Sequence, residues 1–175
     1  MSSSDPASRL LLLMRHGKAD AGSGQPDHER PLAERGLTQA RLVGEYLASQ
    51  NVHLAQVLVS DSLRTTQTWQ AVLSQMPGFD GAVSFEDEIY LGGVGEVVNL
   101  LHGVDDQHGA VMVIGHEPTM ASLMALIGDD DSDPGSVAQA RLGMPTGGMG
   151  VLSGRLEHWS DLGEDSLTLH TIVRP

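Results

Sequence analysis

The stretch RLLLLMRHG at residues 9–17 decides the fold class of this chain. Its first part, Arg9–Met14, is a short and continuous apolar run, which predicts a β-strand covered on both faces. Arg15, His16 and Gly17 follow directly, at the carboxyl end of that strand. Ligands of open α/β sheets bind outside the carboxyl ends of the strands. This tripeptide is therefore the first candidate for a functional site.

Two later stretches repeat this arrangement of a buried strand followed by polar residues. The apolar run QVLV at 56–59 precedes SDSLRTTQT at 60–68, and AVMVI at 110–114 precedes GHEP at 115–118. A helix is predicted to follow each, at Ser62–Gln75 and from Pro118 to about Ile127. The free N–H groups and the dipole of a helix N-terminus favour an anion.

The polar residues at these three strand ends include several that bind anions. If the strands are parallel, Arg15, His16, Arg64 and His116 converge on one edge of the sheet. A phosphate-sized dianion is the natural ligand for such a cluster, because guanidinium groups match phosphate oxygens two at a time. Each residue taken alone has an ordinary explanation as a surface charge or a core histidine; their shared position favours function.

Strands that alternate with helices indicate an α/β sheet with right-handed crossovers. We expect a flexible tail at residues 1–8 and one domain over residues 9–175. The other predicted elements are helices at Thr38–Ser49 and around Gly95–Leu101, strands at Val83–Phe85, Met149–Leu152, Leu156–Trp159 and Leu167–Val173, and an acidic turn at Asp129–Gly135.

The composition excludes several classes of protein. Among the 175 residues, 10 Lys and Arg face 23 Asp and Glu, and this net charge of −13 argues against binding to nucleic acid or to an anionic membrane. There is no cysteine, which excludes disulfides, thiolate metal sites and a thiol nucleophile. No apolar run approaches the ~18 residues of a membrane span. We expect a cytoplasmic monomer.

Four motifs in order resemble the histidine phosphatase superfamily. They are LMRHGKA at the start, ERPLAERG at 29–36, the SxxxRTxQT pattern at 60–68 and GHEP at 115–118. Their spacing and the short chain are most similar to the SixA-type phosphohistidine phosphatase branch, and the resemblance runs from about Leu10 to Thr119. It implies a single-domain, three-layer α/β/α fold with a mostly parallel central sheet, the phosphoglycerate mutase-like fold.

The resemblance also implies a role for each matching residue. His16 is expected to be the nucleophile that takes the phosphoryl group, with Arg15, Arg64 and His116 around the phosphate. Arg30 is expected to be a further substrate-binding residue. Arginine and histidine donors around one nucleophile can supply the positioning and charge that phosphoryl transfer needs. This arrangement requires no metal and no cofactor.

The chain departs from the family pattern at two positions. Ala33 stands where the branch commonly has a threonine, so the following helix lacks that hydroxyl as a cap. Larger members carry a glutamate proton donor after the third strand, and that position falls on Leu91. Glu86, Asp87 and Glu88 lie nearby, but a solvated acidic turn is the simpler interpretation.

The favoured function is a metal-independent phosphatase acting on a protein that bears phosphohistidine, through a phosphohistidine intermediate on His16. One alternative is a phosphatase of small phosphate esters, such as a sugar phosphate or nucleotide; another is a non-catalytic phosphate-binding module. Asp129, Asp131 and Asp133 alternate as in a calcium loop, but Pro134 and Ala140 occupy the positions that need glycine and glutamate, so calcium is not expected there.

Overall fold

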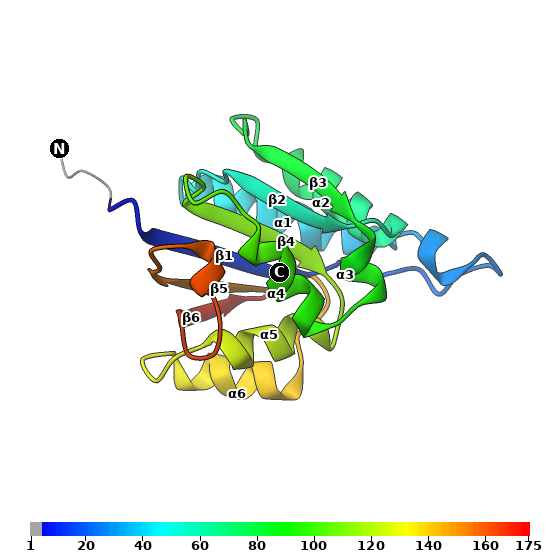
Figure 1. Cartoon of the computed structure of the whole chain (residues 1–175). Coiled ribbons are helices and arrows are strands. Elements are labelled where there is room, and N and C mark those ends of the chain that lie inside the picture. Colours follow the sequence, from blue (N-terminus) through cyan, green and yellow to red (C-terminus); the bar gives the residue numbers. More distant parts are fainter. Residues whose placement is uncertain (1–4) are drawn as a thin grey trace.

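The computed structural model describes residues 5–175, and over these the chain forms one sheet between two layers of helices (Figure 1). In chain order the elements are β1 (Ser8–Arg15), α1 (Glu34–Ser49), β2 (Gln56–Ser60), α2 (Leu63–Leu73), β3 (Ala82–Glu86), α3 (Asp87–Leu91), α4 (Val94–His102), β4 (Ala110–Gly115), α5 (Thr119–Ile127), α6 (Pro134–Leu142), β5 (Met149–Arg155) and β6 (Thr168–Val173). Short 3-10 helices lie at Asp27–Glu29 and Trp159–Asp161.

The six strands are ordered β3-β2-β4-β1-β5-β6. The pairs β3·β2, β2·β4 and β4·β1 are parallel, whereas β5 runs antiparallel to both β1 and β6. Since β1, β2 and β4 are adjacent and parallel, their carboxyl ends meet at one edge of the sheet. The predicted mostly parallel α/β sheet is confirmed.

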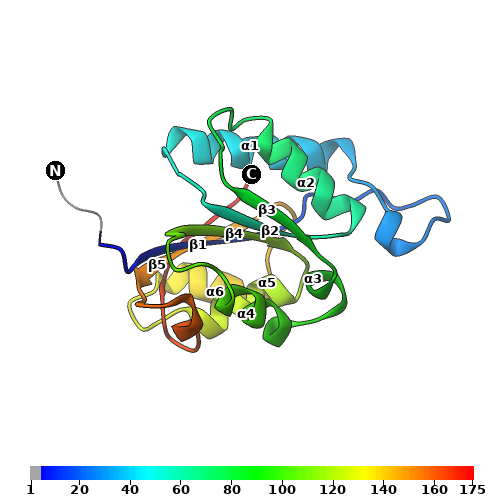
Figure 2. The same cartoon turned by 45° about the horizontal axis from the view of Figure 1, so that its top comes forward.

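Both faces of the sheet are buried, which explains the continuous apolar runs in its central strands. Side chains alternate along a strand, so Leu12 and Met14 of β1 pack toward α1 and α2, while Leu11 and Leu13 pack toward α4, α5 and α6. Figure 2 shows the two helical layers, with α1 and α2 on one side of the sheet and α3 to α6 on the other. This is the expected three-layer α/β/α arrangement.

The N-terminal part of the domain is longer than predicted. The predicted tail at residues 1–8 lies partly outside the described residues, but Ala7 is buried and Ser8 already pairs with Arg155 in β5. Helix α1 begins at Glu34, four residues before the predicted start at Thr38. The apolar periodicity identified only the buried part of that helix, and its first turn is polar.

Three segments differ from their predicted structure. The acidic segment after β3 is not a turn but the short helix α3, and the segment predicted as a turn at Asp129–Gly135 contains the start of α6. Asp133 caps α6 by accepting a hydrogen bond from the Ser136 N–H, and Pro134 occupies its first turn. The predicted strand at Leu156–Trp159 is wrong: Trp159 is buried in the core and its backbone N–H donates to Asp106, so the chain leaves the sheet and forms a 3-10 turn.

Candidate active site

The carboxyl ends of β1, β2 and β4 surround a pocket of about 200 Å3. It is lined by Arg15, His16, Lys18, Ala19, Arg30, Arg64, His116, Glu117 and Thr146. The structure thus brings together all five residues that the sequence singled out. Lys18, Glu117 and Thr146 line the same pocket; the first two belong to the LMRHGKA and GHEP motifs, but none of the three was predicted as a site residue.

His16 lies at the base of this pocket with its backbone held on several sides. Only 8% of the surface of His16 is exposed to solvent. Its N–H donates to the carbonyl of Gly115 at 3.1 Å, and its own carbonyl accepts from the Gly147 N–H at 2.9 Å. The next N–H, of Gly17, donates to the Thr68 hydroxyl at 3.1 Å. His16 is therefore anchored to β4 and to the loop before β5.

Gly17 is required by a close backbone approach. A Cβ atom at this position would lie 2.5 Å from the carbonyl oxygen of Gly36 in the first turn of α1. Two glycines at this crossing let the loop after β1 pass directly against the helix. The RHG tripeptide thus combines a functional histidine with a packing requirement one residue later.

The ring of His16 is oriented by its own neighbour. Nδ1 lies 2.7 Å from the carbonyl oxygen of Gly17. Because a carbonyl can only accept, the proton of the neutral imidazole is on Nδ1, and Nε2 keeps its lone pair. Burial, together with the nearby charges of Arg64, Arg15 and Arg30, lowers the pKa of His16 to about 4, although the hydrogen bond with Gly17 acts in the opposite direction. The imidazole of His16 is consequently neutral near pH 7.

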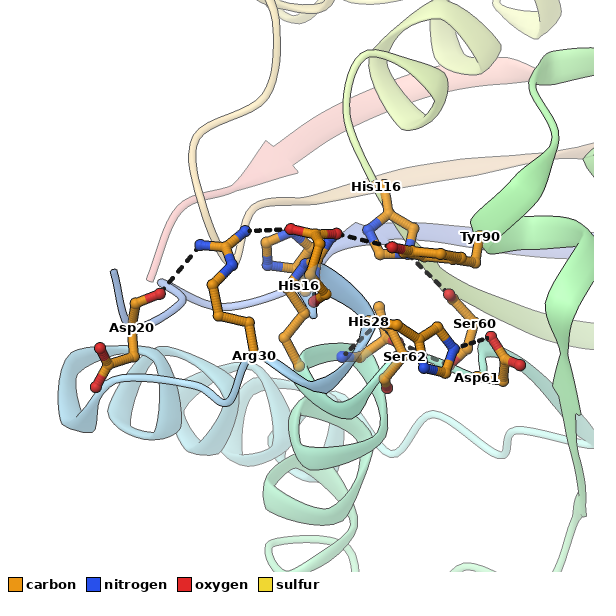
Figure 3. Close-up of polar contacts among 12 residues, drawn as sticks. His16, Asp20, His28, Arg30, Ser60, Asp61, Ser62, Tyr90 and His116 are labelled. Carbon is orange, nitrogen blue, oxygen red and sulfur yellow. Dashed lines mark hydrogen bonds and ion pairs between the residues drawn. The ribbon is translucent and has the colours of Figure 1, made fainter. Parts of the chain in front are cut away.

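His116 lies beside His16, with 5.4 Å between the ring centroids (Figure 3). Its Nε2 forms a 2.7 Å hydrogen bond with the hydroxyl of Ser60, the last residue of β2. Burial lowers the pKa of His116 to about 3, and the charges of His16 and Arg64 act in the same direction. Two neutral histidines therefore lie side by side in the lining of the pocket.

The three arginines reach the pocket from three different segments. Arg15 Nη1 donates to the carbonyl of Met144 at 2.8 Å. Arg64, in the first turn of α2, donates from Nη1 and Nη2 to the backbone oxygen and the Oδ2 of Asp27. Among the described residues, the buried Nε atoms of Arg15 and Arg64 have no protein partner. Unpaired buried donors on two arginines beside His16 suit an oxyanion ligand.

Asp27 and Tyr90 belong to this site, and the sequence did not single them out. Asp27 Oδ1 accepts from Arg30 at 3.0 Å, while Oδ2 accepts from Arg64 at 3.0 Å and from the Tyr90 hydroxyl at 2.9 Å. These bonds, that of Tyr90 first, lower the pKa of Asp27 to about 2. The Tyr90 ring lies edge-on to His116 and to His28. Sixty-three residues separate Asp27 from Tyr90, so no local pattern could link them.

The acidic residues near the expected proton-donor position do not enter the pocket. Within residues 5–175, Glu86, Asp87, Glu88 and Leu91 are all absent from the lining, and Leu91 is 76% exposed. Glu117 does line the pocket, but its two carboxylate oxygens accept from the backbone N–H groups of Ala121 and Met144. It holds the start of α5 to the loop after α6.

The aspartates of the calcium-like segment have structural roles. Asp133 caps α6, and Asp129 accepts from the Thr168 hydroxyl at 2.8 Å. Over residues 5–175, no group of three His, Cys, Asp or Glu side chains is arranged to hold a metal ion. None of the helices in that part of the chain is long and apolar enough to span a membrane.

Comparison with known proteins places this chain in a family. The profile of the histidine phosphatase superfamily (branch 1) matches residues 11–87. An uncharacterized protein of Mycobacterium tuberculosis is 32% identical over 151 residues, which are 85% of this chain and 91% of that protein. Phosphohistidine phosphatase SixA of Escherichia coli is 33% identical over 127 residues, covering 71% of this chain and 77% of that protein.

Solved structures agree over nearly the whole chain. A SixA protein from Nakamurella multipartitia superimposes with a TM-score of 0.83 at 32% identity, covering 98% of this chain and 99% of that one. Protein histidine phosphatase SixA in complex with tungstate gives a TM-score of 0.75 at 26% identity, covering 95% and 97%. The chain therefore belongs to the histidine phosphatase superfamily. Within that superfamily it is a member of the SixA-type branch.

Proposed function

We propose that this chain is a protein phosphohistidine phosphatase that works through a covalent phosphoryl intermediate on His16, without a metal ion. The observation that carries the proposal is the burial, the tautomer and the charged surroundings of His16. It is buried at the base of the pocket with its proton held on Nδ1 by Gly17, and three arginines and His116 surround it. An unprotonated Nε2 that faces an anion pocket is the group that a phosphoryl transfer requires.

The proposed reaction proceeds in two displacements. In the first, the Nε2 lone pair attacks phosphorus, the bond from phosphorus to the substrate's ring nitrogen breaks, and its electron pair leaves with the ring. In the second, water attacks the phosphorus on His16, releasing inorganic phosphate and restoring the imidazole. Arg15, Arg64 and His116 would stabilise the charge on the equatorial oxygens in both steps, and Arg30 would contact the substrate.

Two observations favour phosphohistidine over small phosphate esters. Two of the similar proteins are named as histidine phosphatases, and one of these is in complex with tungstate, an oxyanion of phosphate-like shape. In this chain, no carboxyl group among residues 5–175 lines the pocket apart from Glu117, whose two oxygens hold backbone N–H groups. An alkoxide leaving group needs a positioned acid, which typically contributes about 10²–10⁴-fold, whereas an imidazole ring is readily protonated near neutral pH.

The experiment is a comparison of substrates and of one variant. The wild-type protein is expected to turn over a phosphohistidine protein with a much higher kcat/KM than sugar phosphates, with activated aryl phosphates between them. His16→Ala is expected to fold and to lose activity by several orders of magnitude. A neutral-pH quench with labelled substrate should place the label on His16 in the wild type. Equal rates on sugar phosphates and the phosphoprotein would favour the small-ester alternative, and an active His16→Ala would refute the nucleophile.

A further inference from the structure

The carboxylate of Asp27 does not itself line the anion pocket, but it binds arginines that do. The Asp27 side chain is 54% exposed, whereas His16 at the base of the pocket is 8% exposed. Asp27 nevertheless binds two of the arginines that line the pocket, Arg30 and Arg64, each at 3.0 Å. A negative charge at this place weakens phosphate binding, so its presence needs a reason other than binding phosphate.

The carboxylate of Asp27 contacts residues on both sides of His16. In Figure 3, Arg30 and Tyr90 lie on opposite sides of His16. Because Asp27 contacts Arg30 through Oδ1 and Tyr90 through Oδ2, its carboxylate lies between these two residues. In an in-line displacement the leaving group departs opposite the nucleophile. A leaving group that departs from His16 toward solvent would pass Arg30 and Arg64, and Asp27 is bound to both of these arginines.

The bonding of Asp27 keeps one acceptor position available. An ionised carboxylate has about four lone-pair sites, and within the described residues Arg30, Arg64 and Tyr90 use three. The same three partners keep the pKa of Asp27 near 2, so the group stays ionised at neutral pH and cannot itself donate a proton. What it can do is accept one more hydrogen bond from a donor on the substrate.

We propose that Asp27 is a specificity-determining residue that accepts a hydrogen bond from the free ring N–H of the substrate's phosphorylated imidazole. The inference rests on the proposed function and adds to it a reason for the preference for phosphohistidine. A phosphorylated imidazole with a proton on its other nitrogen carries a positive charge on its ring, and Asp27 stabilises that form of the ring. When the phosphorus–nitrogen bond breaks, the electron pair returns to the ring, which leaves as neutral imidazole and keeps its proton. No proton donor is needed in this step.

The test compares two small substrates on matched variants. N-phosphoimidazole carries the ring N–H, and p-nitrophenyl phosphate has a good leaving group without one. In Asp27→Asn, the ratio of kcat/KM for N-phosphoimidazole to that for p-nitrophenyl phosphate is expected to fall about tenfold or more, as for the loss of a hydrogen bond to a charged group. Asp61→Asn removes an equal charge from the same rim, where Asp61 binds His28, and should leave the ratio unchanged.

Tyr90→Phe provides a second variant, because it keeps the Asp27 carboxylate and removes only one of its donors. Its ratio is expected to stay close to that of the wild type. If Asp27→Asn slows or speeds both substrates equally, Asp27 serves only to position the arginines or to compete with phosphate, and the inference is wrong. A wild-type protein that hydrolyses p-nitrophenyl phosphate but neither N-phosphoimidazole nor a phosphohistidine protein would refute the proposed function itself.

Discussion

Ser60 and His116, from the ends of neighbouring parallel strands, are joined by a 2.7 Å hydrogen bond between Oγ and Nε2. Ser60 is completely buried, so the serine end of this partly buried bond is shielded from water. It occupies one ring nitrogen of His116 and leaves Nδ1 as the only ring nitrogen that can contact a phosphoryl group. We therefore expect Ser60 to be a positioning residue that acts through His116.

Replacing Ser60 by alanine tests this relationship. Ser60→Ala leaves the ring free to rotate, and kcat is expected to fall about tenfold, the value of a buried hydrogen bond to a group that carries charge in the transition state. Ser60→Thr keeps the hydroxyl and should restore most of the rate. If both variants lose activity equally, the effect comes from packing. The measurement is kcat and KM for an aryl phosphate, with circular dichroism to confirm the fold.

The free energy of unfolding is expected to decrease as the pH is lowered through the range in which His16 titrates. Its pKa is 6.5 unfolded and about 4 folded, so between these values only the unfolded chain takes up the proton. The unfolded state then binds more protons, and the free energy of unfolding decreases as pH falls from 6.5 to 4. The loss from His16 amounts to about 3 kcal/mol at the acid end. Urea midpoints measured at a series of pH values should decline across this window.

A matched variant and a direct titration check the same prediction. His16→Asn removes the titrating group, and its urea midpoints should decline less steeply between pH 6.5 and 4 than those of the wild type. NMR titration of the ring C–H resonances should show that His16 stays neutral well below pH 6. An ordinary transition near 6.5 at His16 would contradict the lowered pKa and the argument for a neutral nucleophile.

Arg64→Lys separates charge from geometry in the pocket. A lysine keeps the positive charge, but it cannot donate to Asp27 with two nitrogens and to a phosphate with a third. We expect kcat/KM to fall about 10²–10³-fold, as when one preorganised donor is removed from a charged transition state. Arg155→Lys changes an arginine whose partners, Asp5 and Glu157, lie outside the pocket, and it should leave kcat/KM unaltered. A nearly active Arg64→Lys would show that charge alone suffices.

Activity is expected to survive exhaustive treatment with a chelator. Arg15, Arg30 and Arg64 supply three positive charges to a pocket of about 200 Å3, which is the contribution that a metal ion makes in other phosphatases. The rate should be the same before and after EDTA and should not rise on addition of Mg²⁺ or Zn²⁺. Loss with chelator and recovery with either ion would contradict a pocket that relies on arginines.

The parts of the fold that sequence predicts best are those that local patterns encode. The apolar runs of β1 and β4 need only their own residues to be identified, because strands buried on both faces cannot alternate with polar residues. Helix α6 was missed although its start has two recognised signals, an aspartate cap at 133 and Pro134. The preceding acidic residues and Gly135 outweighed those signals and suggested a turn.

The residues of the site likewise include some that local sequence patterns encode and others that only the folded structure brings together. Arg15, His16, Arg64 and His116 could be predicted because each directly follows a strand or opens a helix, and parallel strands bring such positions together. Asp27 and Tyr90 could not, because their contact depends on how a loop after β1 folds against α3. The lowered pKa of His16 likewise depends on burial in the assembled molecule. Side-chain contacts across the fold remain beyond a single sequence.

The anchoring of His16 determines when this residue loses its conformational entropy. The residue follows the last residue of a strand, yet hydrogen bonds from Gly147 and to Gly115 hold its backbone, and Gly17 fixes its ring. Its conformational entropy is lost when the chain folds rather than when substrate arrives. In the proposed mechanism, preorganisation of this kind would raise the effective molarity of the attacking nitrogen. The entropy cost of reaching the reactive geometry would then fall on the phosphorylated substrate and not on the enzyme.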